Sequence, residues 1–556
     1  MPNPESPATS KPSSPRLCLC LGAILALALG LRLVGIGFNL DTRVPERALL
    51  DQVDERGMVE DVLVALERGD LNPRGFLHRG PGAFVVFLAV DVPVLGVLAL
   101  GHPNGWDWVL ADMRANTSLL QLVHRVVSAL FGTATVALLA FALRREFGTS
   151  SALWGAALLA VAYQHVRDSH LGRVDVIWAF FSLLTAVRLW ALVRRPSLAN
   201  HLLAGSQVGV AMALKYPGGL LAFALIGAHW VARRAAAEEQ RAGPSFPRLL
   251  AGLASILIGA LLFFPGIVSA WSELITTFRF AWSHFAPEPD AGSRLAALSS
   301  HLRYTLGCGL GEPALVLSVI GLVLAWRRGP AGRILALAVA AVAPNILVTS
   351  FVAPRLADPL IVLLAGAAGL ALSVAWEHRV RWLGIVLALA AFLPPLAHSL
   401  AFDWLMLQTD TRVEMLVELK RRGLPAEQVL AFGSPASLPR PMQRGRKPFV
   451  SNYQIAFGDS LAFEPKRLPD ADARFAALLQ SPPRLILWCE SEAMSPATQP
   501  FAELLRSRYR EVLRLDGRRV PILLPGPVGA DLFPFDRPWL MRQPGSALVL
   551  HERIDG

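Results

Sequence analysis

The sequence predicts an all-α polytopic membrane bundle of about eleven transmembrane helices, followed by a small soluble α/β domain. Hydrophobic residues make up 53% of the chain and charged residues only 17%. A soluble protein of 556 residues needs more charge on its surface than this. Apolar runs long enough to cross a bilayer recur between residues 17 and 401. Beyond residue 401 the apolar runs shorten to strand length and alternate with helical patterns.

The chain begins with a polar segment, residues 1–16, whose Pro and Ser content predicts a disordered tail. The run 17–38 is too long for the core of a signal peptide and has no small-residue cleavage site, so we interpret it as a retained helix. The predicted spans are 17–38, 119–143, 150–166, 176–193, 201–214, 217–232, 249–271, 313–326, 332–352, 357–376 and 382–401. Many are rich in Ala and Gly, which predicts close packing between helices.

Basic residues follow alternate spans, which predicts the orientation of the bundle. They are Arg144 and Arg145, Arg194 and Arg195, Arg233 and Arg234, Arg327 and Arg328, and Arg379 with Arg381. If these loops are cytoplasmic, the N-terminus is inside and the domain 402–556 is outside. This requires that the apolar stretch 82–101 does not cross the membrane, and Asp91 and Pro93 favour an interfacial or re-entrant helix there. The first outer loop then spans residues 39–118.

Two parts outside the bundle have recognisable patterns. In the outer loop, Met58, Val62 and Leu66 recur at helical spacing, predicting an amphipathic surface helix that begins with Asp54 and Glu55. In the domain 402–556 we expect strands at 428–432, 484–488, 520–524 and 547–550, and helices at 411–422, 471–480 and 498–508.

Several ionisable residues are expected to collect at the outer ends of the spans. They are Asp54, Glu55, Arg79, Arg125, Arg173, Asp175, Lys215 and Arg355. Charges at membrane depth are unfavourable and are more often functional than incidental. Carboxylates accept a proton from an attacking hydroxyl, and Arg and Lys hold a phosphate. A sugar joined through phosphate to a membrane lipid needs both kinds of group at the bilayer surface.

Other interpretations of the composition are weaker. The net charge of +11 lies in short clusters between apolar runs, which is typical of membrane topology and predicts no nucleic-acid partner. The four cysteines have no disulfide or zinc spacing, and the histidines lack the spacing of a metal site.

Segments along most of the chain resemble the C-type membrane glycosyltransferases, above all the protein O-mannosyltransferase and aminoarabinose-transferase superfamily and its bacterial branch. They are DERGMVEDVLVALERGDLNP (54–73), HRVVSALFGTATVALLAFALRREFG (124–148), SHLGRVDVIWAFF (169–181), LAGSQVGVAMALKYPGG (203–219), PRLADPLIVLLAGAAGL (354–370), DTR (410–412) and RQPGSALVLHER (542–553). No single motif is decisive, but their order and spacing match the family.

The resemblance implies transfer of a sugar from a polyprenyl-phosphate donor to an acceptor outside the cytoplasm, with inversion at the anomeric carbon. It implies that Asp54 is the general base or orients the acceptor, and that Glu55 supports it. It implies that Arg79 contacts the lipid phosphate and that Arg125, Lys215 and Arg355 match recurrent basic positions that bind substrate or phosphate. Asp175 matches the acidic residue of the second outer loop, in the same substrate-binding group. The partners would be the bilayer, the lipid-linked sugar and a protein, glycolipid or polysaccharide acceptor. The location would be a bacterial inner membrane.

Alternatives remain open at this point. Relatives usually have Tyr-Pro or Pro-Pro where this chain has His78-Arg79-Gly80-Pro81, and Arg-Tyr where it has Arg355-Leu356, which indicates a different donor or an inactive member. A lipid-linked-sugar flippase or other transporter and a non-catalytic scaffold are the rival functions. Asp54 also suits a helix N-cap, Asp175 a structural ion pair with Arg173 or Arg125, and Lys215 and Arg355 interfacial anchors. No metal ligand is assigned, but a divalent ion at Asp54 and Asp175 is a further alternative.

Overall fold

The computed structural model describes residues 15–40, 53–69, 80–264, 271–285, 291–347, 354–377, 381–424, 429–432, 480, 483–489, 499–517, 538–545 and 547–554. Each of the eleven predicted spans contains a helix. These helices are α1 (Pro15–Leu33), α5 (Ser118–Phe147), α6 (Thr149–Val161), α8 (Val174–Arg194), α9 (Leu198–Leu214), α10 (Leu221–Glu238), α11 (Phe246–Phe263), α14 (Glu312–Arg327), α15 (Pro330–Val342), α17 (Asp358–Glu377) and α18 (Arg381–Met406). The predicted fold class, a polytopic helical bundle, is confirmed.

Length and apolar composition support membrane crossing. In the described part of the chain, nine helices are long and apolar enough to span a bilayer, or ten if the bent pair 294–308 and 312–327 forms one span. The helices α6 and α9 are apolar but shorter. Connecting elements are α7 (Tyr163–Ser169), η2 (Tyr216–Leu220), α12 (Trp271–Phe285), α13 (Ala291–Ser300), the π-helical η4 (His301–Cys308), α16 (Pro344–Leu347), η5 (Pro354–Ala357) and η8 (Pro538–Leu540).

Small residues allow the helices to approach closely, as the composition predicts. A Cβ atom on Gly205 of α9 would collide with the Gly252 carbonyl oxygen of α11, and one on Gly259 would collide with Ser206. Helix α17 is buried from Asp358 through Ser373, so it forms the centre of the bundle. Without water in a bilayer, packing of this kind and interhelical hydrogen bonds stabilise the assembly.

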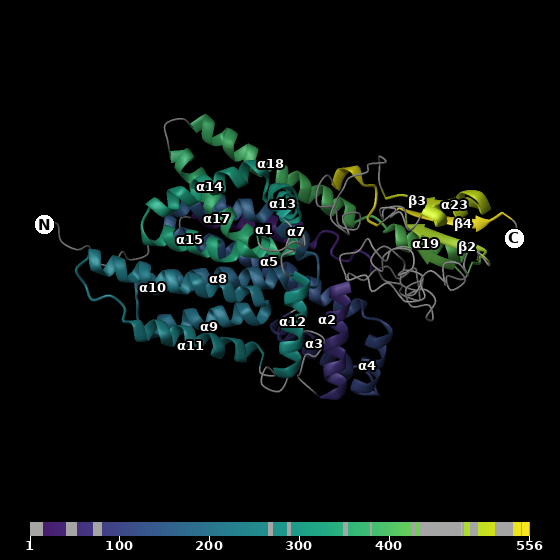
Figure 1. Cartoon of the computed structure of the whole chain (residues 1–556), viewed down its shortest axis with the longest axis horizontal. Helices are drawn as coiled ribbons and strands as arrows, with labels where there is room; N and C mark the ends of the chain where they lie inside the picture. The colour runs from purple at the N-terminus through teal and green to yellow at the C-terminus, as the bar shows by residue number, and fades with distance from the viewer. Residues whose placement is uncertain are drawn as a thin grey trace.

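The outer-loop helices α2 (Val53–Arg68), α3 (Pro81–Leu100) and α4 (Gly105–Ala115) pack together at the end of the bundle away from the N-terminus (Figure 1). The predicted amphipathic helix is confirmed as α2, and its apolar face joins an apolar cluster with α3, α4 and the start of α5. Although α3 is among the nine helices of sufficient length, its first turn contacts the end of α9. Its middle residue Asp91 bonds His124 in the second turn of α5 at 2.7 Å. The start and middle of α3 therefore contact one end of the bundle, and an interfacial or re-entrant helix at 82–101 stays a prediction.

The opposite end of the bundle carries the basic pairs that predicted the orientation. Arg194 at the end of α8 forms an ion pair with Glu146 at the end of α5. The indole of Trp190 donates to the Ala331 carbonyl at the start of α15, 2.8 Å away. The ends of these helices thus meet on one side, which a single cytoplasmic face requires.

Residues beyond the bundle form a small α/β unit at the α2–α4 end (Figure 1). It contains α19 (Thr411–Arg421), β1 (Val429–Phe432), β2 (Leu485–Cys489), α23 (Gln499–Arg508), β3 (Tyr509–Leu515) and β4 (Leu548–Arg553). The sheet order is β1-β2-β4-β3, with β1 parallel to β2 and the other pairs antiparallel. Met415 and Leu419 of α19 pack on the strands.

The strands predicted at 428–432, 484–488 and 547–550 are confirmed as β1, β2 and β4. The predicted strand 520–524 lies outside the described residues, as does the predicted helix 471–480 apart from residue 480. The sequence did not indicate β3, which begins where we expected α23 to end. Its charged residues Arg510, Glu511 and Arg514 obscure the apolar pattern because β3 is an edge strand that is largely open to solvent.

Candidate active site

Glu55, in the first turn of α2, is almost completely buried and receives donors from two other elements. Arg125 of α5 binds it in a bidentate pair, with Nε 2.7 Å from Oε1 and Nη2 2.9 Å from Oε2. The Gly172 amide also donates to Oε1, over 2.7 Å. This carboxylate therefore joins α2, α5 and the turn before α8.

Arg125 is fully buried, and all three of its guanidinium nitrogens donate hydrogen bonds. Nη1 donates to the carbonyl oxygens of Ile36, at 3.0 Å, and Phe38, at 2.7 Å. The guanidinium also lies 4.0 Å from the centroid of the Phe38 ring. This geometry supports a structural role for Arg125 and gives no support to the predicted phosphate contact.

Two other predicted site residues, Asp54 and Arg79, belong to the outer loop before α3. Asp54 lies in α2 next to Glu55, and because the helix begins at Val53, Asp54 falls within its first turn. Arg79 lies outside the described residues. Its neighbour Gly80 has a φ of +104°, and a Cβ there would overlap the Leu214 carbonyl oxygen and lie 3.3 Å from the Cα of Lys215. Glycine is required at this close approach.

Asp175 and Lys215 form the second charged centre, between the start of α8 and the end of α9. Lys215 Nζ donates to Asp175 Oδ1, and Arg173 Nε lies 3.6 Å from Oδ2. Arg355, in η5, lies within electrostatic range of the same carboxylate. The structure thus brings together three predicted site residues, Asp175, Lys215 and Arg355. The ion pair with Arg173 that the sequence left open is also present.

Asp168, in α7, extends this centre. Its Oδ1 accepts from Arg167 Nη2, at 3.0 Å, and from Arg173 Nη2, at 3.2 Å. Its Oδ2 accepts from Gln164 Nε2 at 2.5 Å. The sequence prediction missed Gln164, Arg167 and Asp168 as partners of the site. A run of polar residues directly after an apolar span was the available signal.

Asp358 is the most unusual member of this centre. It is the first residue of α17, three positions after Arg355, and it is completely buried. In the part of the chain that the structure describes, neither carboxyl oxygen has a hydrogen-bond partner. The charges of Lys215, Asp175 and Asp168 all act on it. The sequence prediction missed Asp358, although an Asp at the start of an apolar run is itself a signal. We call Lys215, Asp175, Asp168, Arg167, Arg173, Arg355 and Asp358 the open centre.

These carboxylates do not form an evident metal site. In the part of the chain that the structure describes, no three His, Cys, Asp or Glu side chains are placed to hold one ion. The side chain of Asp54, which the alternative metal site would require, lies outside that part.

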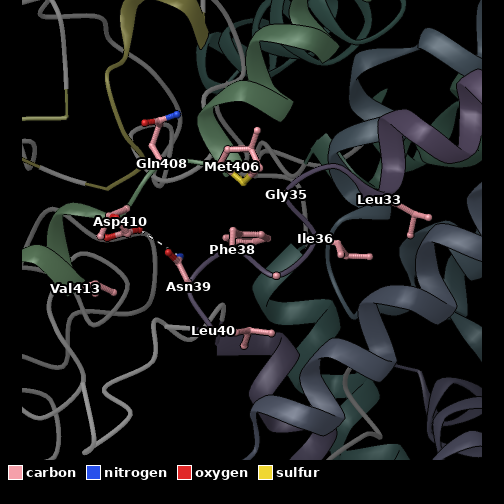
Figure 2. A pocket seen from close by; sticks show the side chains of 13 residues that line it. Leu33, Gly35, Ile36, Phe38, Asn39, Leu40, Met406, Gln408, Asp410 and Val413 are labelled. Atoms are coloured by element: carbon pink, nitrogen blue, oxygen red, sulfur yellow. Dashed lines mark hydrogen bonds between the residues drawn. The ribbon is translucent and has the colours of Figure 1, made fainter. Parts of the chain in front are cut away.

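A separate cavity of about 430 Å³ lies between the segment after α1 and the junction of α18 with α19. Figure 2 shows Phe38, Asn39, Met406 and Asp410 around it, with a hydrogen bond of 3.3 Å from Asn39 Nδ2 to Asp410 Oδ2. Asp410 of the DTR segment also binds Arg412, with 2.9 Å between Oδ1 and Nε. The cavity does not include the open centre, but the Phe38 carbonyl connects its wall to Arg125.

Comparison with known proteins gives two independent kinds of match, one to a family model and one to solved structures. A family model described as dolichyl-phosphate-mannose-protein mannosyltransferase matches residues 102–264, which contain Arg125, Asp175 and Lys215. The crystal structure of ArnT from Cupriavidus metallidurans bound to undecaprenyl phosphate matches with a TM-score of 0.52 at 13% identity, over 97% of this chain and 98% of that one. The chain has the fold of the C-type membrane glycosyltransferases. The predicted resemblance is confirmed in the fold and, at the level of sequence, over residues 102–264.

Other structures agree on this fold. ArnT from the same organism in the apo state gives a TM-score of 0.52 at 16% identity, covering 96% of this chain and 98% of that one. The apo oligosaccharyltransferase of Archaeoglobus fulgidus gives 0.50 at 13% identity, covering 99% and 90%. No curated protein sequence matches the chain at a significant level.

Proposed function

We propose that this protein, which has the fold of the C-type membrane glycosyltransferases, transfers a sugar from a polyprenyl-phosphate donor to an acceptor hydroxyl outside the cytoplasm. The transfer would invert the configuration at the anomeric carbon. The observation that carries the proposal is the open centre, where Lys215, Arg173 and Arg355 surround Asp175 at the same end of the bundle as α2. Basic groups in a water-poor site bind phosphate and stabilise the charge that develops as it leaves. Undecaprenyl phosphate bound to ArnT, which has the same fold, supports a lipid phosphate as the ligand.

The reaction follows from these groups. The acceptor oxygen attacks the anomeric carbon, and the bond from that carbon to the phosphate oxygen breaks. Lys215, Arg355 and Arg79 stabilise the phosphate, which keeps the bonding electrons. Asp54 accepts the proton of the acceptor hydroxyl. Asp175 positions the Lys215 ammonium, which uses one of its three donors on this carboxylate.

Glu55 and Arg125 have a supporting role in this proposal. Their buried bidentate pair fixes the first turn of α2, where Asp54 lies. A base acts efficiently only when it is held at hydrogen-bond distance from the proton it removes. The acceptor, a protein, glycolipid or polysaccharide, would approach from the side of the C-terminal domain, past the cavity at Phe38 and Asp410. We propose a bacterial inner membrane as the location.

The test uses the purified chain in lipid nanodiscs with a panel of radiolabelled polyprenyl-phosphate sugars, with water as the acceptor that takes the sugar. Wild type should release polyprenyl phosphate from one donor, and Asp54→Asn should lower that release by about 100-fold or more, within the range for general base catalysis. Asp54→Asn should keep the wild-type melting temperature, because it keeps the shape of the side chain. Full release by Asp54→Asn would refute the base. Movement of intact donor across proteoliposomes without breakdown would indicate a transporter instead.

A further inference from the structure

We infer that Asp358 binds the donor's sugar, by hydrogen bonding to the hydroxyl on C2, next to the anomeric carbon. The inference rests on the proposed function, because it requires the phosphate to bind at the open centre. It deepens that function by naming the class of donor, a sugar with a free 2-hydroxyl, and a residue that selects it.

The Asp358 side chain is 0% exposed, and within the described residues neither of its carboxyl oxygens has a hydrogen-bond partner. Buried polar groups nearly always have partners, because leaving one unpaired destabilises the fold. The other two carboxylates of the open centre obey this rule. Asp168 accepts from Gln164 and Arg167, and Asp175 from Lys215. Asp358 therefore has hydrogen-bonding capacity that a ligand can use.

The position of Asp358 supports the same assignment. Asp358 begins α17 directly after η5, which carries Arg355, and it lies within electrostatic range of Lys215. Arg355 and Lys215 are the proposed phosphate ligands. In a polyprenyl-phosphate sugar the phosphate is attached at C1, so the 2-hydroxyl is the sugar hydroxyl nearest to it. A phosphate at Lys215 and Arg355 would therefore place that hydroxyl in the same charged centre as Asp358.

The chemistry of glycosyl transfer also favours a hydrogen bond at the 2-hydroxyl. Glycosyl transfer develops positive charge at the anomeric carbon, and hydrogen bonds to the neighbouring hydroxyl strengthen as the transition state forms. A carboxyl group is a strong partner for a hydroxyl in a buried site. A site built around that hydrogen bond discriminates against sugars that lack the hydroxyl, because its own polar group is then left unpaired. Sugars with no hydroxyl or with an acetamido group at C2 should be poor donors.

The experiment compares three donors on one polyprenyl phosphate, in nanodiscs with the full chain. They are the fastest donor from a panel of mannosyl, glucosyl and arabinosyl forms, its 2-deoxy counterpart and its 2-acetamido counterpart. Wild type should favour the 2-hydroxy donor over the 2-deoxy donor by about 10- to 100-fold in kcat/KM, mostly through kcat. Asp358→Leu should lose most of the wild-type rate with the 2-hydroxy donor. It should turn over the 2-hydroxy and 2-deoxy donors almost equally. Asp358→Asn should lie between them.

Two controls separate sugar recognition from folding. Binding of polyprenyl phosphate without sugar should be the same for wild type and Asp358→Leu, because Asp358 is assigned to the sugar. The control variant is Ser373→Ala on the same helix. The Ser373 hydroxyl lies 2.8 Å from the Ser151 hydroxyl and is not part of the open centre, so this variant should keep the wild-type preference for the 2-hydroxy donor.

Wild-type discrimination in Asp358→Leu would overturn the inference and leave the proposed function intact. Loss of polyprenyl-phosphate binding in Asp358→Leu would also overturn it, in favour of a structural role. A wild-type chain that breaks down none of these donors would refute the proposed function and this inference together.

Discussion

Two charged centres lie at the same end of the bundle and differ in how completely they are hydrogen-bonded. Between Glu55 and Arg125, every guanidinium nitrogen and both carboxylate oxygens have partners. In the open centre, counting only described residues, Asp358 has two oxygens without partners and Lys215 has one hydrogen bond for three donors. A completed network leaves a ligand nothing to bind, so it serves to hold the elements together. An incomplete network in a buried place is one that a ligand completes.

The comparison also separates residues that the sequence had grouped together. Arg125 and Lys215 are both basic residues near the outer ends of spans, and the family resemblance gave them the same role. Their surroundings differ, because Arg125 is fully buried with carbonyl and carboxylate partners, whereas the Lys215 side chain is 15% exposed. We call Glu55 and Arg125 the closed pair. The difference predicts that substitutions in the closed pair lower the stability of the fold and that substitutions in the open centre weaken substrate binding or turnover.

The largest effect on stability is expected at the closed pair. Glu55→Ala would leave the Arg125 charge buried without its counterion, and breaking such a pair destabilises proteins by about 3–5 kcal/mol. Unfolding of the purified variant in mixed detergent micelles measures this loss. Glu55→Gln keeps the shape and some of the hydrogen bonds, so it should lose less. A Glu55→Ala protein with wild-type stability but no activity would show that Glu55 acts in catalysis directly, contrary to the comparison.

A smaller effect is expected where the chain meets the open centre. Gly80→Ala would force a left-handed φ on alanine and press its Cβ against the Leu214 carbonyl, next to Lys215. Strain of this kind amounts to about 1–3 kcal/mol, and the shift at Lys215 should raise KM for the donor. Gly105→Ala is the matched control, because Gly105 also has a positive φ, of 52°, but open space around it. Equal effects of the two changes on KM would argue against a link to Lys215.

The smallest effect is expected at an exposed ion pair of the outer loop. Arg114 donates two hydrogen bonds to Glu67, from Nε to Oε1 at 2.7 Å and from Nη2 to Oε2 at 2.5 Å. This hydrogen bonding lowers the pKa of the Glu67 carboxyl below its usual 4.5. The pair therefore stabilises the fold above about pH 4.5, and this contribution is lost as the pH falls through the lower pKa of the folded protein. Both side chains are more than a third exposed, so the contribution should be only about 0.2–1 kcal/mol. Unfolding of Glu67→Gln and wild type between pH 3 and 7 measures it. A difference that grows as the pH falls would contradict this sign.

The helical part of the fold was predictable because hydropathy alone determines it. All eleven apolar runs became helices, since a chain in a bilayer must satisfy its backbone hydrogen bonds within each segment. The amphipathic helix at Asp54 and Glu55 was predictable from its spacing for a similar reason. Strand β3 was not, because edge strands tolerate charges such as Arg510 and Arg514 that hide their pattern.

The candidate site was predictable only as a set of residue types. Charge at the ends of spans identified Asp175, Lys215 and Arg355, which the structure brings together. It did not reveal that Arg125 has all its nitrogens engaged, since carbonyl partners such as those of Ile36 and Phe38 leave no mark in a sequence. The unpartnered state of Asp358 likewise depends on what the surrounding helices do not offer, and only three-dimensional packing determines that.

The most direct test of the comparison is a titration of the purified chain in nanodiscs with polyprenyl phosphate, followed by native mass spectrometry. Wild type should bind the lipid, and Lys215→Ala should bind it about 10- to 100-fold more weakly, as expected for loss of a hydrogen bond between charged groups. Lys215→Ala should lose less stability than Glu55→Ala, because Arg173 still faces Asp175. If Lys215→Ala binds polyprenyl phosphate as tightly as wild type, the open centre is not the phosphate site and the account is wrong.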